Sequence, residues 1–140
     1  MTDSTVRRVV FFSALYDLLV TWPFATPWTA SWLSGQLGSL HLQLGLGGVG
    51  PSLDSSTALL FANLMGSIVT VWSILRLLRP TAELGAADTA GRALFSTWML
   101  FALLHGASAT LLPFLVLEVA WGLVQGAVVL PRVWRPVQQA

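Results

Sequence analysis

Four apolar stretches dominate this 140-residue sequence and constrain its fold more than any other feature. An α-helix needs about 20 mostly apolar residues to cross the hydrocarbon core of a bilayer, and each stretch approaches that length. Only 9% of the residues are charged, against about a quarter in soluble domains. So few charged side chains cannot cover the surface of a water-soluble protein. We predict one all-α domain over residues 1–140, a polytopic integral membrane protein built as a four-transmembrane-helix bundle, with helices over residues 9–33, 58–78, 89–105 and 110–130.

Residues that favour helix ends mark these boundaries. Asp88 or Thr89 is predicted to cap the third helix, because both side chains can accept a backbone N–H hydrogen bond. Gly106 is predicted to end that helix in the left-handed conformation, and Pro113 fits the first turn of the fourth. Pro80 stops the second helix, since proline cannot continue the hydrogen-bond ladder.

Arginine placement predicts the orientation, because cytoplasmic loops of membrane proteins carry an excess of Arg and Lys. All seven basic residues are arginines, and they precede the first stretch, flank the second connection or follow the fourth stretch: Arg7, Arg8, Arg76, Arg79, Arg92, Arg132 and Arg135. The other two connections contain neither Arg nor Lys. The alternation predicts cytosolic N and C termini in a multi-pass protein of a bacterial inner membrane.

The external loop over residues 34–53 is rich in Gly and Leu, and His41 is its one residue that titrates near neutral pH. Leucines alternate with other residues from Leu40 to Leu46, which favours a short extended or interfacial segment. Two interpretations remain open for this loop. It is a flexible connector on the membrane surface, which its glycines favour, or a lid over the outer mouth of the bundle.

Several function classes are excluded by composition. The absence of cysteine removes disulfides, thiolate metal sites and CxxC redox relays. A net charge of +1 leaves no basic surface for nucleic acid. We predict no cofactor. Heme through His41 or His105 is disfavoured, because heme-binding bundles hold their axial ligands within packed helices.

Each predicted helix carries one strongly polar group at membrane depth, namely Asp17, Asn63, His105 and Glu118 in chain order. Such groups are costly in lipid and normally face the bundle interior, so we expect them to converge on one polar pocket. Aromatic side chains at similar depth add a wall for an apolar ligand. The candidate ligand-binding residues are Asp17, Asn63, His105, Glu118, Trp98 and Trp121. A purely structural network that fixes helix register is the competing interpretation.

The predicted helix count, orientation and buried carboxylates Asp17 and Glu118 resemble the four-helix membrane group that includes sterol isomerases and the sigma-2 receptor. The cavities of that group carry acidic residues. The DoxX-like group is similar in architecture. The likeness covers architecture alone, since no motif transfers residue by residue.

Three functions follow as hypotheses. The first is binding of a lipid or apolar small molecule in a polar-centred cavity that opens outward. The second is a non-catalytic accessory subunit, bound to other membrane protein subunits in a larger complex. The third is a small proton-coupled transporter, in which Asp17 and Glu118 share protons.

Overall fold

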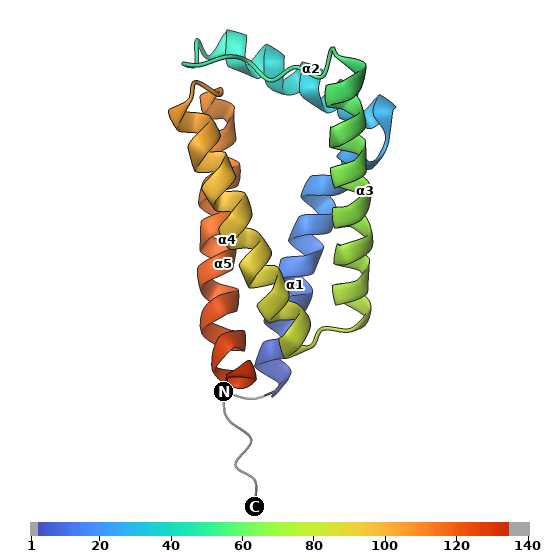
Figure 1. Ribbon diagram of the computed structural model, residues 1–140, viewed down its shortest axis with the longest axis vertical. Helices are drawn as coiled ribbons and strands as arrows, with labels where there is room; N and C mark the ends of the chain where they lie inside the picture. The colour runs from blue at the N-terminus through green and yellow to red at the C-terminus, as the bar shows by residue number, and fades with distance from the viewer. Residues whose placement is uncertain (1–2, 135–140) are drawn as a thin grey trace, which may run out of the picture.

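The computed structural model describes residues 3–134, and over that range the chain is all-α. Five α-helices are present: α1 (Asp3–Thr21), α2 (Pro27–Gln43), α3 (Ser56–Leu78), α4 (Ala82–Leu104) and α5 (Leu112–Val133). Two short 3-10 turns, η1 (Trp22–Ala25) and η2 (Ala109–Leu111), precede α2 and α5. Four helices run lengthwise, and α2 lies across the end opposite to the one where α1 begins (Figure 1).

Three helical segments are long and apolar enough to cross a membrane, judged by length and composition within the described residues. They are Asp3–Ala25, Ser56–Leu78 and Ala109–Val133. The helix α4 has 23 residues, but its first half carries Glu83, Asp88 and Arg92. With these three segments, the chain is a helical protein suited to a multi-pass membrane location.

The prediction of one helix over residues 9–33 is wrong, because the chain turns sharply in the middle of that stretch. The helix α1 ends at Thr21, and η1 follows with Pro23 in its first turn. Thr26 then caps α2 by accepting a hydrogen bond from the Thr29 backbone N–H, and Pro27 begins the new helix. Proline cannot donate to a preceding helical turn, so two prolines this close break the helix.

The third predicted helix begins earlier than residue 89. The helix α4 starts at Ala82, and the Thr81 side chain caps it by accepting from the Leu84 N–H. Asp88 is therefore not a cap, because it lies about two turns inside the helix. The second predicted helix is confirmed as α3, which Ser55 caps by accepting from the Ala58 N–H.

The turn between α4 and α5 forms as the sequence predicts. Gly106 has a φ of 93°, in the left-handed region that glycine adopts without strain. Pro113 lies in the first turn of α5. These two residues produce a helical hairpin, and α4 and α5 lie side by side along their length (Figure 1).

The segment over residues 34–53, predicted as an external loop, is helical in its first half, and it reaches from one side of the molecule to the other (Figure 1). The helix α2 continues to Gln43, so the extended segment expected after Leu40 does not form. Beyond it, the Val49 N–H donates to the Gly106 carbonyl at 2.7 Å. His41 Nδ1 lies 2.8 Å from Ser108 Oγ. The segment is thus attached to the α4–α5 turn, and both interpretations of it, a connector and a lid, stay predictions.

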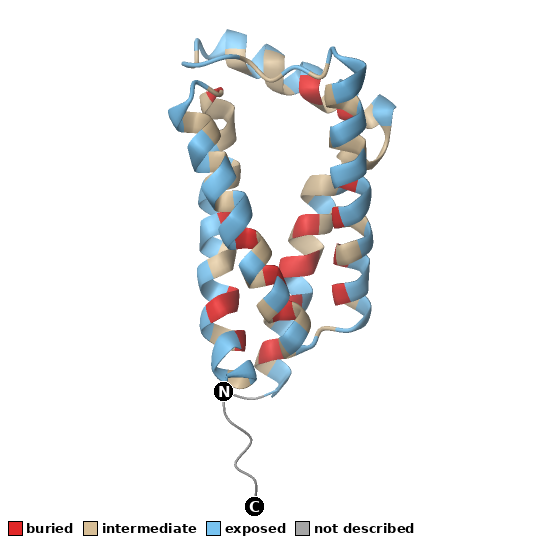
Figure 2. Ribbon diagram, in the orientation of Figure 1, coloured by how far each residue is buried: buried red, intermediate tan, exposed pale blue. Residues whose placement is uncertain are grey.

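The long helices form two pairs, α1 with α3 and α4 with α5. The pairs approach each other in the half of the molecule where α1 begins, and the buried residues concentrate there (Figure 2). A small apolar core of Val6, Val10 and Val129 lies at this end. Gly85 allows close approach there, because an added Cβ would lie 2.7 Å from a methyl group of Val10.

We expect Gly66→Ala to destabilise the fold. A Cβ on this α3 glycine would lie 2.6 Å from the backbone nitrogen of Ala25 in η1, and backbone cannot move aside cheaply. The free energy of unfolding should fall by about 1–3 kcal/mol, measured on the purified protein in a neutral detergent. Gly91→Ala in α4 is the control, since nothing lies within 4 Å of its added Cβ. Replacing that helical glycine should raise the free energy of unfolding by about 1 kcal/mol. An equal loss of stability in both variants would contradict the close η1–α3 packing.

Candidate functional site

Two arginines are buried in the region where the helix pairs meet. The side chain of Arg76, near the end of α3, is 0% exposed and that of Arg92, in the middle of α4, is 2% exposed. A guanidinium group is very costly to bury without carboxylate partners. Each arginine therefore requires acidic groups close to it, and the neighbouring helices supply them.

Asp17 on α1 connects both arginines. Its Oδ2 accepts hydrogen bonds from Arg76 Nη2 at 2.5 Å and from Arg92 Nη2 at 2.6 Å. Ser13, one turn earlier on α1, accepts from the same Arg92 nitrogen at 2.8 Å. One carboxylate thus joins α1 to α3 and to α4, across the boundary between the two helix pairs.

Asp88 is the second carboxylate in contact with both arginines. It lies four residues before Arg92, on the same face of α4, and its Oδ2 accepts from Arg92 Nε at 3.0 Å. The same oxygen is 2.6 Å from Arg76 Nη1. Trp72 Nε1 donates to Oδ1, and Gln125 Nε2 donates to Oδ2, both at 2.9 Å. Asp88 is therefore enclosed by donors from α3, α4 and α5.

Glu118 on α5 completes the group. Its Oε2 accepts from Arg92 Nη1 at 2.9 Å. Gln125 lies two turns further along the same face of α5 and also donates to the Gly85 carbonyl at 2.9 Å. We call the five charged residues Asp17, Arg76, Asp88, Arg92 and Glu118 the ion-pair network.

The ion-pair network contains one carboxylate more than it has guanidinium groups. Asp17 Oδ1 and Glu118 Oε1 accept no hydrogen bond from the residues that the structure describes. The two side chains are 11% and 10% exposed, while the arginines are almost fully covered. We call these two oxygens, on the least covered side chains of the network, the carboxylate edge. That edge can accept a hydrogen bond or pair with a cation.

Aromatic rings flank this edge. Tyr16 on α1 and Trp121 on α5 lie with ring centroids 6.2 Å apart, and both are partly buried. The Arg92 guanidinium carbon lies 5.9 Å from the centre of the Tyr16 ring, within cation–π range. The carboxylate edge is thus bordered by flat, largely apolar surfaces.

Three of the predicted site residues lie in or beside the network, and three do not. Asp17 and Glu118 share Arg92, and Trp121 packs beside Tyr16. Asn63 instead donates to the Phe24 carbonyl at 2.9 Å, which holds η1 against α3.

The remaining two lie together on the last turns of α4, away from the network. Trp98 is 61% exposed and its ring meets Phe101 edge-on at 6.3 Å. The exposed His105 stacks on Phe101 at 3.9 Å and contacts its carbonyl through Nδ1. Among residues 3–134, no three His, Asp or Glu side chains are arranged to hold a metal ion.

Three interior groups were not predicted, namely Asp88, Arg76 and Arg92. Both arginines were predicted as cytosolic flanking charges, and the structure buries them. The spacing of Asp88 and Arg92 is the signal that was available, because an i, i+4 ion pair on an apolar helix indicates an inward face.

The described part of the chain has a surface pocket of about 430 Å³ at the end where α1 begins. A pocket of about 180 Å³ lies between α2 and the segment around Pro51. Asp17, Asn63 and Glu118 line neither pocket. The cavity predicted for these three residues together stays a prediction.

No protein-family model matches this chain, and neither a curated protein nor a solved structure matches it. The structure shows a small helical protein with three candidate membrane-spanning helices and a buried polar core.

Proposed function

We propose that this protein crosses the membrane four times, with both termini in the cytosol, and binds an apolar small molecule at the carboxylate edge. The ligand carries a cationic group that meets Asp17 Oδ1 and Glu118 Oε1. One observation carries the proposal: three carboxylates face two guanidinium groups, and Asp17 and Glu118, which both pair with Arg92, each keep one oxygen that accepts no hydrogen bond from the described residues.

Charge distribution supports the orientation. Arg7, Arg8, Arg79 and Arg132 belong to the end where α1 begins, whereas Arg135 lies outside the described residues. The opposite end carries three exposed tryptophans on η1 and α2, the residues that prefer the membrane–water interface: Trp22, Trp28 and Trp32. The arginine-rich end is therefore the cytosolic end in our proposal.

The network also supports α4 as the fourth span. A charged residue facing lipid costs about 2.5–3.5 kcal/mol at the helix centre. Asp88 and Arg92 face carboxylates and guanidinium groups instead, so that cost is offset. Apart from Glu83 in the first turn and Thr97, the exposed residues of α4 are apolar, such as Leu94 and Leu104.

Cysteine labelling tests the topology, because the chain has no cysteine of its own. We expect Gln36→Cys, on the exposed surface of α2, to react with a membrane-impermeant maleimide in intact spheroplasts. Glu83→Cys, in the exposed first turn of α4, should react only after permeabilisation. Labelling of both positions from outside would contradict the four-span arrangement.

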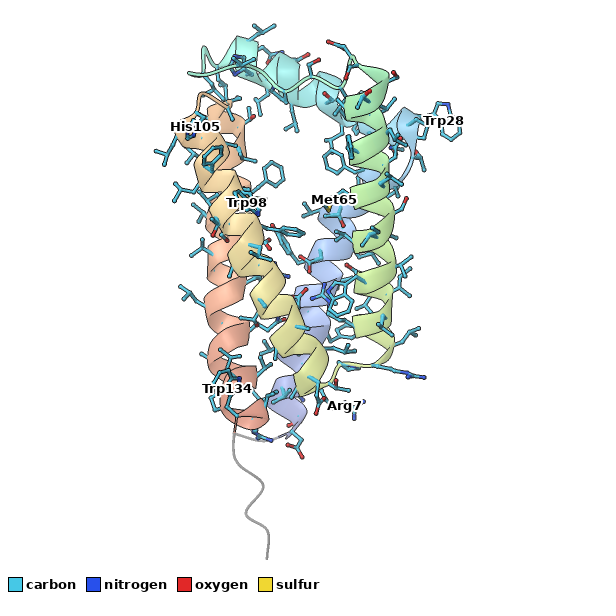
Figure 3. All side chains as sticks on the ribbon, in the orientation of Figure 1. Arg7, Trp28, Met65, Trp98, His105 and Trp134 are labelled. Carbon is cyan, nitrogen blue, oxygen red and sulfur yellow. The ribbon has the colours of Figure 1, made fainter. Side chains whose placement is uncertain are left out.

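Apolar side chains on several helices are available to contact the apolar part of the ligand. Met65 projects from the side of α3 that faces α4 and α5 (Figure 3). Its side chain is nevertheless among the exposed large apolar ones, with 52% of the residue accessible. An inward-facing apolar residue without full protein cover is suited to contact an apolar molecule. Tyr16 and Trp121 supply further apolar surface beside the network.

We expect Glu118→Gln to abolish binding of a cationic apolar ligand while the protein still folds. The change leaves two carboxylates against two guanidinium groups, so the excess negative charge is gone and the Arg92 contact is kept as a hydrogen bond. Dodecylamine, present at ten times its Kd, should stabilise the wild type by about 1.4 kcal/mol. Thermal unfolding in a neutral maltoside detergent measures this, and dodecanol should have little effect.

Glu83→Gln is the matched control for that experiment. It makes the same chemical change on an exposed glutamate of α4 that takes no part in the network. The control should respond to dodecylamine like the wild type. Equal stabilisation of Glu118→Gln would reject the proposed site, and it would favour a purely structural network in an accessory subunit.

A further inference from the structure

A second site is present at the opposite end of the molecule from α2. The pocket of about 430 Å³ lies where the first turn of α1, the α3–α4 connection and the last turn of α5 meet. Its lining includes three arginines, one from each of these segments: Arg7, Arg79 and Arg132. None of them belongs to the ion-pair network.

The charge of this pocket favours an anion. Three guanidinium groups line it, and Asp3 is the one carboxylate among the lining residues. Asp3 pairs with Arg132. Arg7 and Arg79 are exposed, and neither forms an ion pair within residues 3–134. The pocket therefore carries an excess of two positive charges, on side chains able to turn toward a ligand.

The pocket also has an apolar wall. Val6, Leu78 and Pro80 line it beside the arginines. Leu78 is 76% exposed at the end of α3, next to the surface that faces lipid in our proposal. A site with arginines at the membrane surface and apolar residues beside them fits a molecule whose phosphate is attached to acyl chains.

We propose that this pocket binds a phosphate group, and that an anionic membrane lipid supplies it. Guanidinium groups bind phosphate oxygens in paired, charge-assisted hydrogen bonds. In the proposed orientation the pocket lies at the level of the inner headgroups. The site is independent of the carboxylate edge and takes a ligand of opposite charge.

Native mass spectrometry of the detergent-purified protein tests this directly. Phosphatidylglycerol is added in one arm and phosphatidylcholine with the same acyl chains in the other. Inorganic phosphate is added in a third arm as a competitor. We expect one tightly held phosphatidylglycerol and no comparable phosphatidylcholine adduct. If millimolar phosphate displaces the lipid, the pocket recognises phosphate itself and free phosphate is an alternative occupant.

Arginine variants assign the lipid to the pocket. Arg7→Gln and Arg79→Gln should each weaken phosphatidylglycerol binding by roughly fivefold. Arg8→Gln is the matched control, because Arg8 is exposed on the same turn of α1 but does not line the pocket. It should leave binding unchanged. Thermal unfolding without lipid checks that all three variants fold.

Two results would overturn the assignment. Equal binding of phosphatidylglycerol and phosphatidylcholine would show that the pocket does not recognise an anion. If Arg8→Gln weakened phosphatidylglycerol binding as much as Arg7→Gln and Arg79→Gln do, the lipid would be bound by the overall positive charge of this end and not by the pocket. Neither result would affect the carboxylate edge, since dodecylamine binding is measured separately.

Discussion

The buried guanidinium group of Arg92 is the interaction on which the rest of this structure depends. It pairs with carboxylates from three helices, Asp17 of α1, Asp88 of α4 and Glu118 of α5. Burying any of these charges alone would be prohibitive, but mutual pairing offsets the desolvation cost. Removing one partner from such a network typically costs about 3–5 kcal/mol. The two helix pairs are therefore joined by charge pairing at least as much as by their small apolar core.

The position of the ion-pair network explains why the two helix pairs are close in one half of the molecule and apart in the other. Near the network the helices are close, and glycine or serine at the contacts allows that approach, as Gly85 and Ser13 show. Further along, the helix pairs diverge and α2 crosses between their ends (Figure 1). In our proposal, the carboxylate edge supplies the few polar contacts of a ligand site and apolar side chains of the bundle supply the rest, as small-molecule sites typically require.

Hydropathy predicted the positions of α3 and α5, and Gly106 predicted the turn before α5, because these features depend on local sequence. The prediction of one helix in the first stretch was wrong because the hydropathy of a segment does not show where the chain changes direction. Pro23 and Pro27 turn the chain without interrupting the apolar composition. Of the polar groups expected to converge, Asp17 and Glu118 both pair with Arg92. Asn63 instead has a backbone carbonyl in η1 as its partner.

The arginines show why the remainder of the site could not be predicted. Arg76 lies near the end of α3, and Arg92 lies near the start of the helix that was predicted over residues 89–105. The positive-inside rule counts basic residues in such positions as exposed. Their shared partner, Asp17, is 59 and 75 residues away in the sequence. Only the packing of the helices decides whether such groups meet. Asp88 was assigned to a helix end for a similar reason, since its cap preference is local and its ion pairs are not.

A double-mutant cycle between Asp17 and Arg92 tests the central claim most directly, because this contact joins one helix pair to the other. The free energy of unfolding is measured in neutral detergent for the wild type, Asp17→Asn, Arg92→Gln and the double variant. The account predicts that the double variant loses less stability than the two single variants together, with a coupling of about 1.5 kcal/mol or more. Losses that add to within about 0.5 kcal/mol would contradict it.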